Sequence, residues 1–124
     1  MVPAFLLPES TVREDGQSAE VALDALRGRP LLITLGITRI LECENLDVSI
    51  LGSGDGLAWH VVAEFPHKCF CGTYSLPVDL SRHGDVRFLR AEWKMSRWDR
   101  RMPKPIFDFY LFVEHLKVRV AGAA

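Results

Sequence analysis

Regular alternation of apolar and polar residues limits the fold of this sequence more than any other feature. The odd positions of residues 31–38 are all apolar, and so are the even positions of residues 46–50. Side chains of a β-strand point alternately to the two faces of a sheet, so each stretch predicts a strand with one buried face. The same alternation recurs in residues 57–65, 74–80, 89–95 and 107–113.

Two tryptophans fall on the apolar phase of these stretches. They are Trp59 and Trp93. Because a strand keeps its phase when it is regular, both side chains are predicted to lie in the core.

Turn-forming residues separate the predicted strands. Gly, Pro, Asp and Asn, which favour tight turns, gather in residues 27–30, 42–45, 52–56, 83–85 and 101–105. Residues 18–26 could be helical by propensity, but the alternation of Val21 and Leu23 with their neighbours favours a strand. Many strands without a long helical pattern predict an all-β fold. We expect a two-sheet antiparallel β-sandwich of the jelly-roll kind, with about eight strands.

Length and composition predict one domain over residues 1–124. The chain is 48% hydrophobic and 25% charged, which is typical of a globular protein. Its longest nearly uninterrupted apolar stretch, residues 30–37, is far shorter than the ~20 residues of a membrane-spanning helix. No basic residue precedes the apolar residues 4–7, so a secretory signal is not indicated. We expect a protein of the cytoplasm, or of a virion-like particle, without a membrane partner.

The cysteines favour free thiols over disulfides. Three is an odd number, and no export signal is recognisable. The sequence His67-Lys68-Cys69-Phe70-Cys71 is the only cluster that resembles a metal site, but it lacks the second pair of ligands that structural zinc needs. The sequence therefore predicts no metal and no cofactor, with reduced thiols at Cys43, Cys69 and Cys71.

No pattern of residues indicates catalysis. The glycines of residues 52–56 superficially resemble a phosphate-binding loop, but they join two predicted strands instead of opening a helix. Asp55 has too few acidic neighbours in that loop for a calcium site. The protein is therefore expected not to be an enzyme, and a hydrolase with an unfamiliar site ranks last among the hypotheses.

The charges are distributed unevenly along the chain. Residues 1–64 carry four basic and ten acidic side chains, whereas residues 82–104 carry eight basic and three acidic ones. Opposed charges in one domain favour association between copies. Nucleic acid is not expected as a partner, since the sequence pI is near 6.4. The predicted binding residues lie in the loop after residue 96, and they are Arg97, Trp98, Arg100 and Arg101.

One stretch of the chain resembles known sandwich modules. Residues 46–59, LDVSILGSGDGLAW, are similar to the Val-x-x-Ser-x-Asp-Gly-x-x-Trp pattern of discoidin-type galactose-binding-like sandwiches. They resemble more closely a Leu-Asp-Val-x-Ile-x-Gly-Ser-x-Asp-Gly-x-x-Trp unit of β-sandwich proteins in tailed-phage particles. Residues 85–93 and 107–112 resemble later strands of those modules. The resemblance implies a sandwich fold without catalytic residues.

Two functions follow as expectations. The first is a structural or assembly module that forms a homo-oligomer or docks with other assembly proteins, as the resemblance to phage-particle modules implies. The alternative is a carbohydrate-binding module whose loops at the end of the sandwich bind a glycan, as the discoidin group implies.

Overall fold

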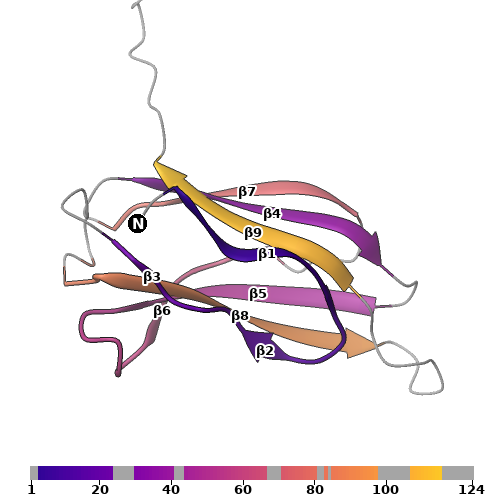
Figure 1. Cartoon of the computed structure of the whole chain (residues 1–124), viewed down its shortest axis with the longest axis horizontal. Helices are drawn as coiled ribbons and strands as arrows, with labels where there is room; N and C mark the ends of the chain where they lie inside the picture. The colour runs from indigo at the N-terminus through magenta and orange to yellow at the C-terminus, as the bar shows by residue number, and fades with distance from the viewer. Residues whose placement is uncertain are drawn as a thin grey trace, which may run out of the picture.

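The computed structural model describes residues 3–23, 30–40, 44–66, 71–80, 83, 85–97 and 107–115, with the backbone alone for residues 44, 96 and 97. Within these ranges nine strands form two antiparallel sheets, which lie one above the other in Figure 1. The four-stranded sheet has the order β1 (Ala4–Val12), β9 (Phe107–His115), β4 (Leu31–Ile40) and β7 (Gly72–Val78). The five-stranded sheet has the order β2 (Gly16–Gln17), β8 (Phe88–Arg97), β5 (Glu44–Ser53) and β6 (His60–Glu64), and β3 (Val21–Ala22) also pairs with β8.

The predicted two-sheet antiparallel sandwich is confirmed. Strands from opposite ends of the chain are neighbours, since β1 pairs with β9, and β2 and β3 pair with β8. This is the winding of a double-sheet jelly roll. The ninth strand arises because β2 and β3 are two pieces of one interrupted strand, both paired with β8. The sheets do not close into a barrel. No helix among the described residues is long and apolar enough to span a membrane.

The core fills the space between the two sheets. Alternate residues of the central strands point into it, and their phase agrees with the prediction from sequence. The hydrophobic residues that are at most 1% exposed on β4, β5, β8 and β9 are Ile33, Leu35, Leu46, Val48, Ile50, Leu89, Ala91, Phe107, Phe109, Leu111 and Val113. Trp93 is 6% exposed, so its predicted place in the core is confirmed.

The prediction for Trp59 is wrong. Trp59 lies before β6 and is half-buried, and its ring contacts Arg90, whose Cζ is 4.3 Å from the ring centroid. The register shifts where Ile50 pairs with Ala63 and Leu51 pairs with Val61, which leaves one extra residue in β6. An extra residue in a strand reverses the faces of those beyond it. Val61 is accordingly 49% exposed.

Strand β1 was not expected from sequence. Its pairing with β9 shifts register twice, between Phe5 and Leu7 and between Leu7 and Ser10. The second shift spans Pro8, which has no N–H for the ladder and is tolerated on an edge strand. These irregularities remove the alternation by which a strand is recognised.

Ser18 explains why the second strand is interrupted. Its Oγ accepts a hydrogen bond from the backbone N–H of Ala91 over 2.8 Å and donates one to the carbonyl of Ala19 over 2.9 Å. The backbone N–H of Ser18 also donates to the carbonyl of Ala91 over 2.8 Å. A side chain thus replaces a ladder hydrogen bond between β2 and β3.

Replacing Ser18 with alanine should lower the free energy of unfolding by about 1–3 kcal/mol, because it leaves the buried N–H of Ala91 without an acceptor. Ser10→Ala is the control, since the Ser10 hydroxyl bonds at an exposed position, and it should change stability by about 0.5 kcal/mol or less. Denaturant titration compares the two variants. Equal losses would contradict this role of Ser18.

Candidate functional site

The outer face of the four-stranded sheet carries aromatic side chains where polar ones are expected. On β9, Tyr110 and Phe112 alternate with the buried residues and therefore point away from the core. Phe112 pairs with Phe5 of β1 on one side and with Thr34 of β4 on the other. The sheet thus brings together residues from both ends of the chain.

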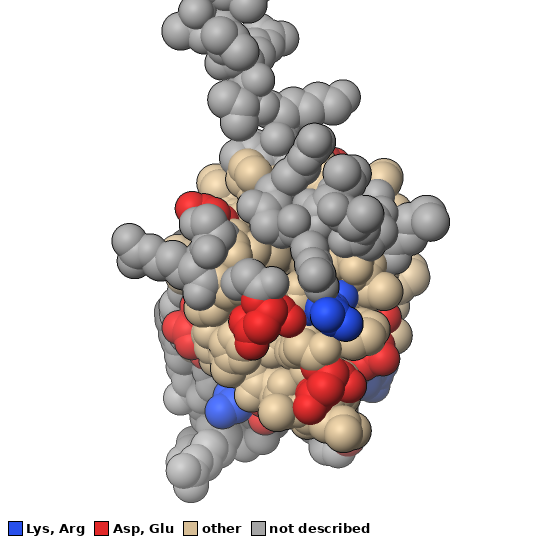
Figure 2. All heavy atoms as spheres, turned by 90° about the vertical axis from the view of Figure 1, so that its left-hand side faces the viewer, with Lys and Arg blue, Asp and Glu red and all other residues tan. Residues whose placement is uncertain are grey.

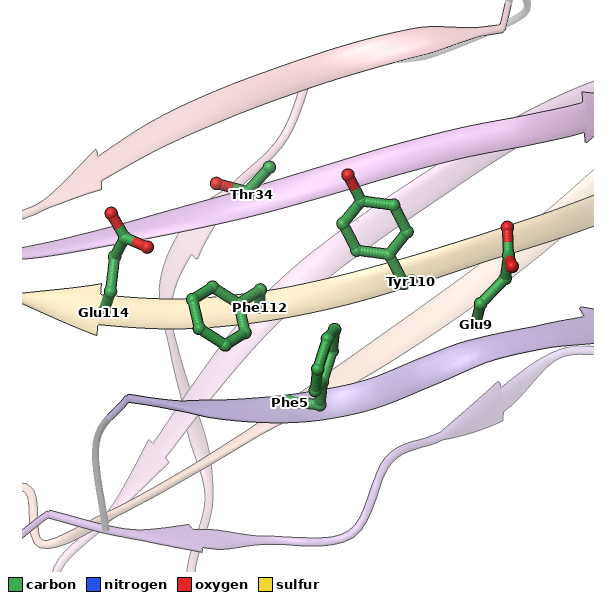
Figure 3. Close-up of a pocket in the computed structure, with 6 residues that line it drawn as sticks. All are labelled: Phe5, Glu9, Thr34, Tyr110, Phe112 and Glu114. Carbon is green, nitrogen blue, oxygen red and sulfur yellow. The ribbon is translucent and has the colours of Figure 1, made fainter.

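A glycine allows the ring of Tyr110 to lie against the sheet. Gly36 pairs with Tyr110, and a Cβ atom at Gly36 would lie only 2.2 Å from two carbons of that ring. The rings of Tyr110 and Phe112 lie along β9 with their faces turned outward, whereas Phe5 is seen nearly edge-on (Figure 3). The Phe5 ring makes angles of 81° with Tyr110 and 60° with Phe112. Two ring faces therefore form a floor, and Phe5 forms a wall.

These residues line a shallow groove with a volume of about 500 Å³, and we call it the aromatic groove. Glu9 and Glu114 lie at its two ends, and Thr34 lies beside the aromatic floor (Figure 3). Phe5 is 52% exposed, which is unusual for a large aromatic side chain. An exposed apolar patch with polar ends is a feature of binding surfaces.

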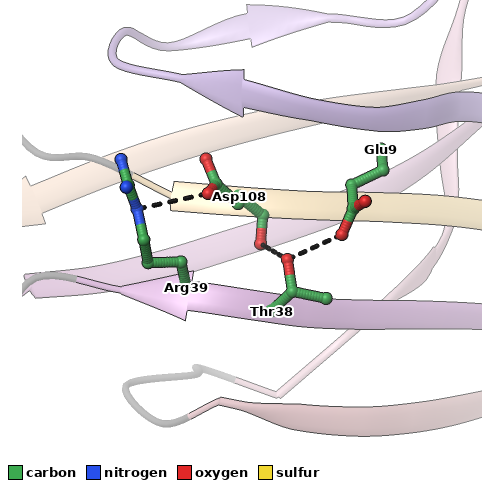
Figure 4. A network of polar contacts seen from close by, with 4 residues as sticks. All are labelled: Glu9, Thr38, Arg39 and Asp108. Atoms are coloured by element: carbon green, nitrogen blue, oxygen red, sulfur yellow. Dashed lines mark hydrogen bonds and ion pairs between the residues drawn. The ribbon is translucent and has the colours of Figure 1, made fainter.

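A polar network joins three strands at one end of the aromatic groove (Figure 4). The hydroxyl of Thr38 donates to Glu9 Oε1 over 2.8 Å, and it also lies 3.1 Å from the carbonyl oxygen of Asp108. Arg39 Nε lies 3.2 Å from Asp108 Oδ2. Thr38 falls where the pairing of β4 with β9 shifts register, between Ile37 and Arg39. This bulge orients Glu9 and pairs the charge of Arg39 with Asp108.

The structure does not describe the side chains of the binding residues predicted from sequence. Arg97 is the last residue of β8, where its backbone pairs with Glu44, and its side chain is not described. Trp98, Arg100 and Arg101 lie outside the described residues. Sequence reasoning missed the aromatic groove. Its one sequence signal is that Tyr110 and Phe112 occupy positions of the last strand where polar residues are expected.

The turn predicted at residues 52–56 is confirmed, because β5 ends at Ser53 and residues 54–59 lead into β6. Asp55 Oδ1 accepts hydrogen bonds from the N–H groups of Leu57 and Ala58 over 2.8 and 3.0 Å. Ser53, which is fully buried, donates to the same oxygen and accepts from the N–H of Gly56. Gly56 has a φ of +79°, which side-chain-bearing residues rarely adopt. The carboxylate therefore closes the turn between β5 and β6.

The hydrogen bonds to its carboxylate, from Ala58, then Leu57 and then Ser53, lower the pKa of Asp55. Because the pKa of Asp55 is lowered in the folded state, its ionised carboxylate stabilises the fold at a pH above the pKa that Asp55 has in the unfolded chain. This stabilisation is lost as the pH falls through the pKa of Asp55 in the folded state. We expect an NMR titration to place the Asp55 midpoint below the ordinary value of an aspartate. A midpoint at the ordinary value would contradict these hydrogen bonds.

The described residues include one cysteine and a pair of neighbouring histidines. Cys71 is a free, exposed thiol, whereas Cys43 and Cys69 lie outside the described ranges. The rings of His60 and His83 lie 5.4 Å apart. Within the parts of the chain that are described, no group of three or more His, Cys, Asp and Glu side chains could hold a metal ion.

Among the described residues, acidic side chains are more prominent than basic ones at the end of the sandwich that Figure 2 shows. In the end view of Figure 2 the acidic side chains of the described residues form several patches, and basic side chains are fewer.

Comparison with known protein families, with curated proteins and with solved structures finds no match to this chain. The fold alone therefore defines its class, an all-β protein with two antiparallel sheets packed as a sandwich.

Proposed function

We propose that the protein is a non-catalytic structural module, which associates with copies of itself or docks with other proteins of a larger, phage-particle-like assembly. The observation that carries this proposal is the exposed aromatic groove around Phe5 on the edge strand β1. Apolar surface of this kind is stabilised when another molecule covers it. The resemblance of residues 46–59 to phage-particle sandwiches supports the same function.

The open edges of the sheets also support association. A sheet edge presents unpaired N–H and C=O groups, which a strand of another chain can bind. Strand β7 is an edge strand that pairs with β4 over residues 72–78 without a register shift. Its outer edge is therefore regular, in contrast to the irregular β1.

Reversing two charges should weaken the association. We expect the Arg97→Glu and Arg100→Glu double variant to have a solution mass close to the 14.0 kDa of the monomer, because it removes basic groups that attract acidic surfaces of other copies. Light scattering measures the mass, and circular dichroism shows whether the fold is kept.

The matched control reverses the charges of Arg13 and Arg87 by the substitutions Arg13→Glu and Arg87→Glu. Both residues are exposed, and the change in net charge is the same. It should retain the mass of the wild type. A double Arg97 and Arg100 variant that associates like the wild type would contradict a role of this loop.

Carbohydrate recognition is the second candidate function. The outward ring faces of Tyr110 and Phe112 favour it, because sugar rings stack on flat aromatic surfaces while carboxylates such as Glu9 and Glu114 accept hydrogen bonds from hydroxyls. This places the candidate glycan site on a sheet face instead of the end loops. An NMR titration with neutral oligosaccharides tests it, and Tyr110→Ala should abolish any binding seen.

A further inference from the structure

We infer that the aromatic groove binds a basic segment of a second copy of this chain, and that the segment is residues 97–104. This inference rests on the proposed function, because it names the contact through which the copies associate. Four properties support it: the hydrogen-bonding groups of the groove, its ring faces, its charge, and the composition of the segment.

Two carboxylates give the aromatic groove its charge. Glu9 and Glu114 accept hydrogen bonds and donate none, whereas the hydroxyls of Thr34 and Tyr110, which also belong to the described lining, can both donate and accept. Lys and Arg side chains only donate, and their positive charge strengthens a hydrogen bond to a carboxylate. A neutral saccharide lacks that charge, so the described lining favours cationic side chains.

The ring faces suit the same side chains. Residues two apart on a strand lie about 6.8 Å from each other, so Tyr110 and Phe112 form a floor between the two carboxylates. A guanidinium or ammonium group is attracted to the face of an aromatic ring. The aliphatic stem of Arg or Lys also packs on apolar surface while its charged end reaches a carboxylate.

The charge of the groove is not neutralised by its own lining. None of the described residues that line it is Lys, Arg or His. The polar network beside the groove contains one cation, Arg39, which is paired with Asp108. Glu9 accepts from Thr38, but a carboxylate has room for several donors and can bind an incoming cation as well.

The chain itself contains a segment of complementary composition. Residues 97–104 hold four basic side chains and one acidic side chain, and the aromatic Trp98 lies among them. A contact between two different surfaces of identical molecules gives a closed dimer when it is reciprocal and a larger species when it is not. Either species has a mass above that of the monomer.

The experiment uses two full-length variants and their mixture. The groove variant carries Glu9→Lys and Glu114→Lys, and the segment variant carries Arg97→Glu and Arg100→Glu. Each should lower the self-association constant at least about tenfold, because attraction becomes repulsion. Mixing the two should restore a higher mass, since the mixture contains an intact groove and an intact segment on different chains.

Controls separate this inference from the proposed function. A variant with Glu20→Lys and Glu64→Lys changes the charge of two exposed residues outside the groove by the same amount and should associate like the wild type. If the groove variant is unstable, Glu9→Gln with Glu114→Gln is the milder substitute, and it should weaken association about fivefold. The masses are measured by light scattering at low salt.

The outcomes are distinct. Loss of association in both variants, with recovery in the mixture, supports the inference. If the wild type associates and the groove variant does so equally, the inference is wrong and the proposed function survives. A wild type that is always monomeric overturns both. NMR shifts at Tyr110 and Phe112 with a neutral oligosaccharide, but not with a peptide of residues 96–105, would overturn the inference in favour of a glycan.

Discussion

Replacing Trp93 with alanine should lower the free energy of unfolding by about 3–5 kcal/mol. The side chain is 6% exposed, and its Nε1–H donates to the carbonyl of Glu14 over 3.0 Å. A Cβ atom on Gly16 would lie 3.0 Å from the indole, so β2 packs closely over the ring. Alanine would remove this packing and the hydrogen bond to the Glu14 carbonyl. Denaturant titration measures the loss.

Trp59→Ala is the natural comparison, since it removes the same side chain from a half-buried position. The ring packs against Arg90 outside the core, and the expected loss is about 1 kcal/mol, near that of a cation–π contact. A loss as large as that of Trp93→Ala would contradict the position of Trp59 outside the core.

Phe109→Ala should have an effect of similar size, about 3–5 kcal/mol. Phe109 is completely buried, and its ring meets Trp93 edge-to-face with centroids 5.5 Å apart and an angle of 83°. Phe109 belongs to β9 and Trp93 to β8, so this contact joins the two sheets.

The double variant tests that contact. Because both single variants lose the same pair of rings, the double variant should lose about 0.5–1.5 kcal/mol less than the sum of the two. Denaturant titrations of all four proteins give the coupling. If the double variant loses as much free energy of unfolding as the two single variants together, a direct contact between the rings is contradicted.

The strands that could be predicted are the regular ones. Ile33 and Leu35, like Phe109 and Leu111, alternate without interruption, so their inward phase follows from the geometry of a strand alone. The alternation of a sequence does not reveal a bulge, since one extra residue exchanges the buried and exposed positions of the strand without changing its composition. For that reason Trp59 was misplaced and the irregular β1 was not recognised.

The aromatic groove could not be predicted because sheet pairing creates it. Phe5 and Phe112 are neighbours only after β1 pairs with β9, and the Tyr110 ring lies flat only because Gly36 is opposite it. Neither relation can be read from local spacing. The charge asymmetry, in contrast, is a property of composition, so the sequence alone predicts self-association from it.

The solution mass of the wild-type protein, measured by light scattering at high protein concentration across a salt series, tests the proposed self-association most directly. Raising the salt from 0.1 M to 1 M shortens the Debye length from ~10 Å to ~3 Å, which screens contacts between exposed charges. We predict a mass above the 14.0 kDa of the monomer at low salt, and a decrease as salt rises. A mass of 14.0 kDa at every salt concentration would contradict the account.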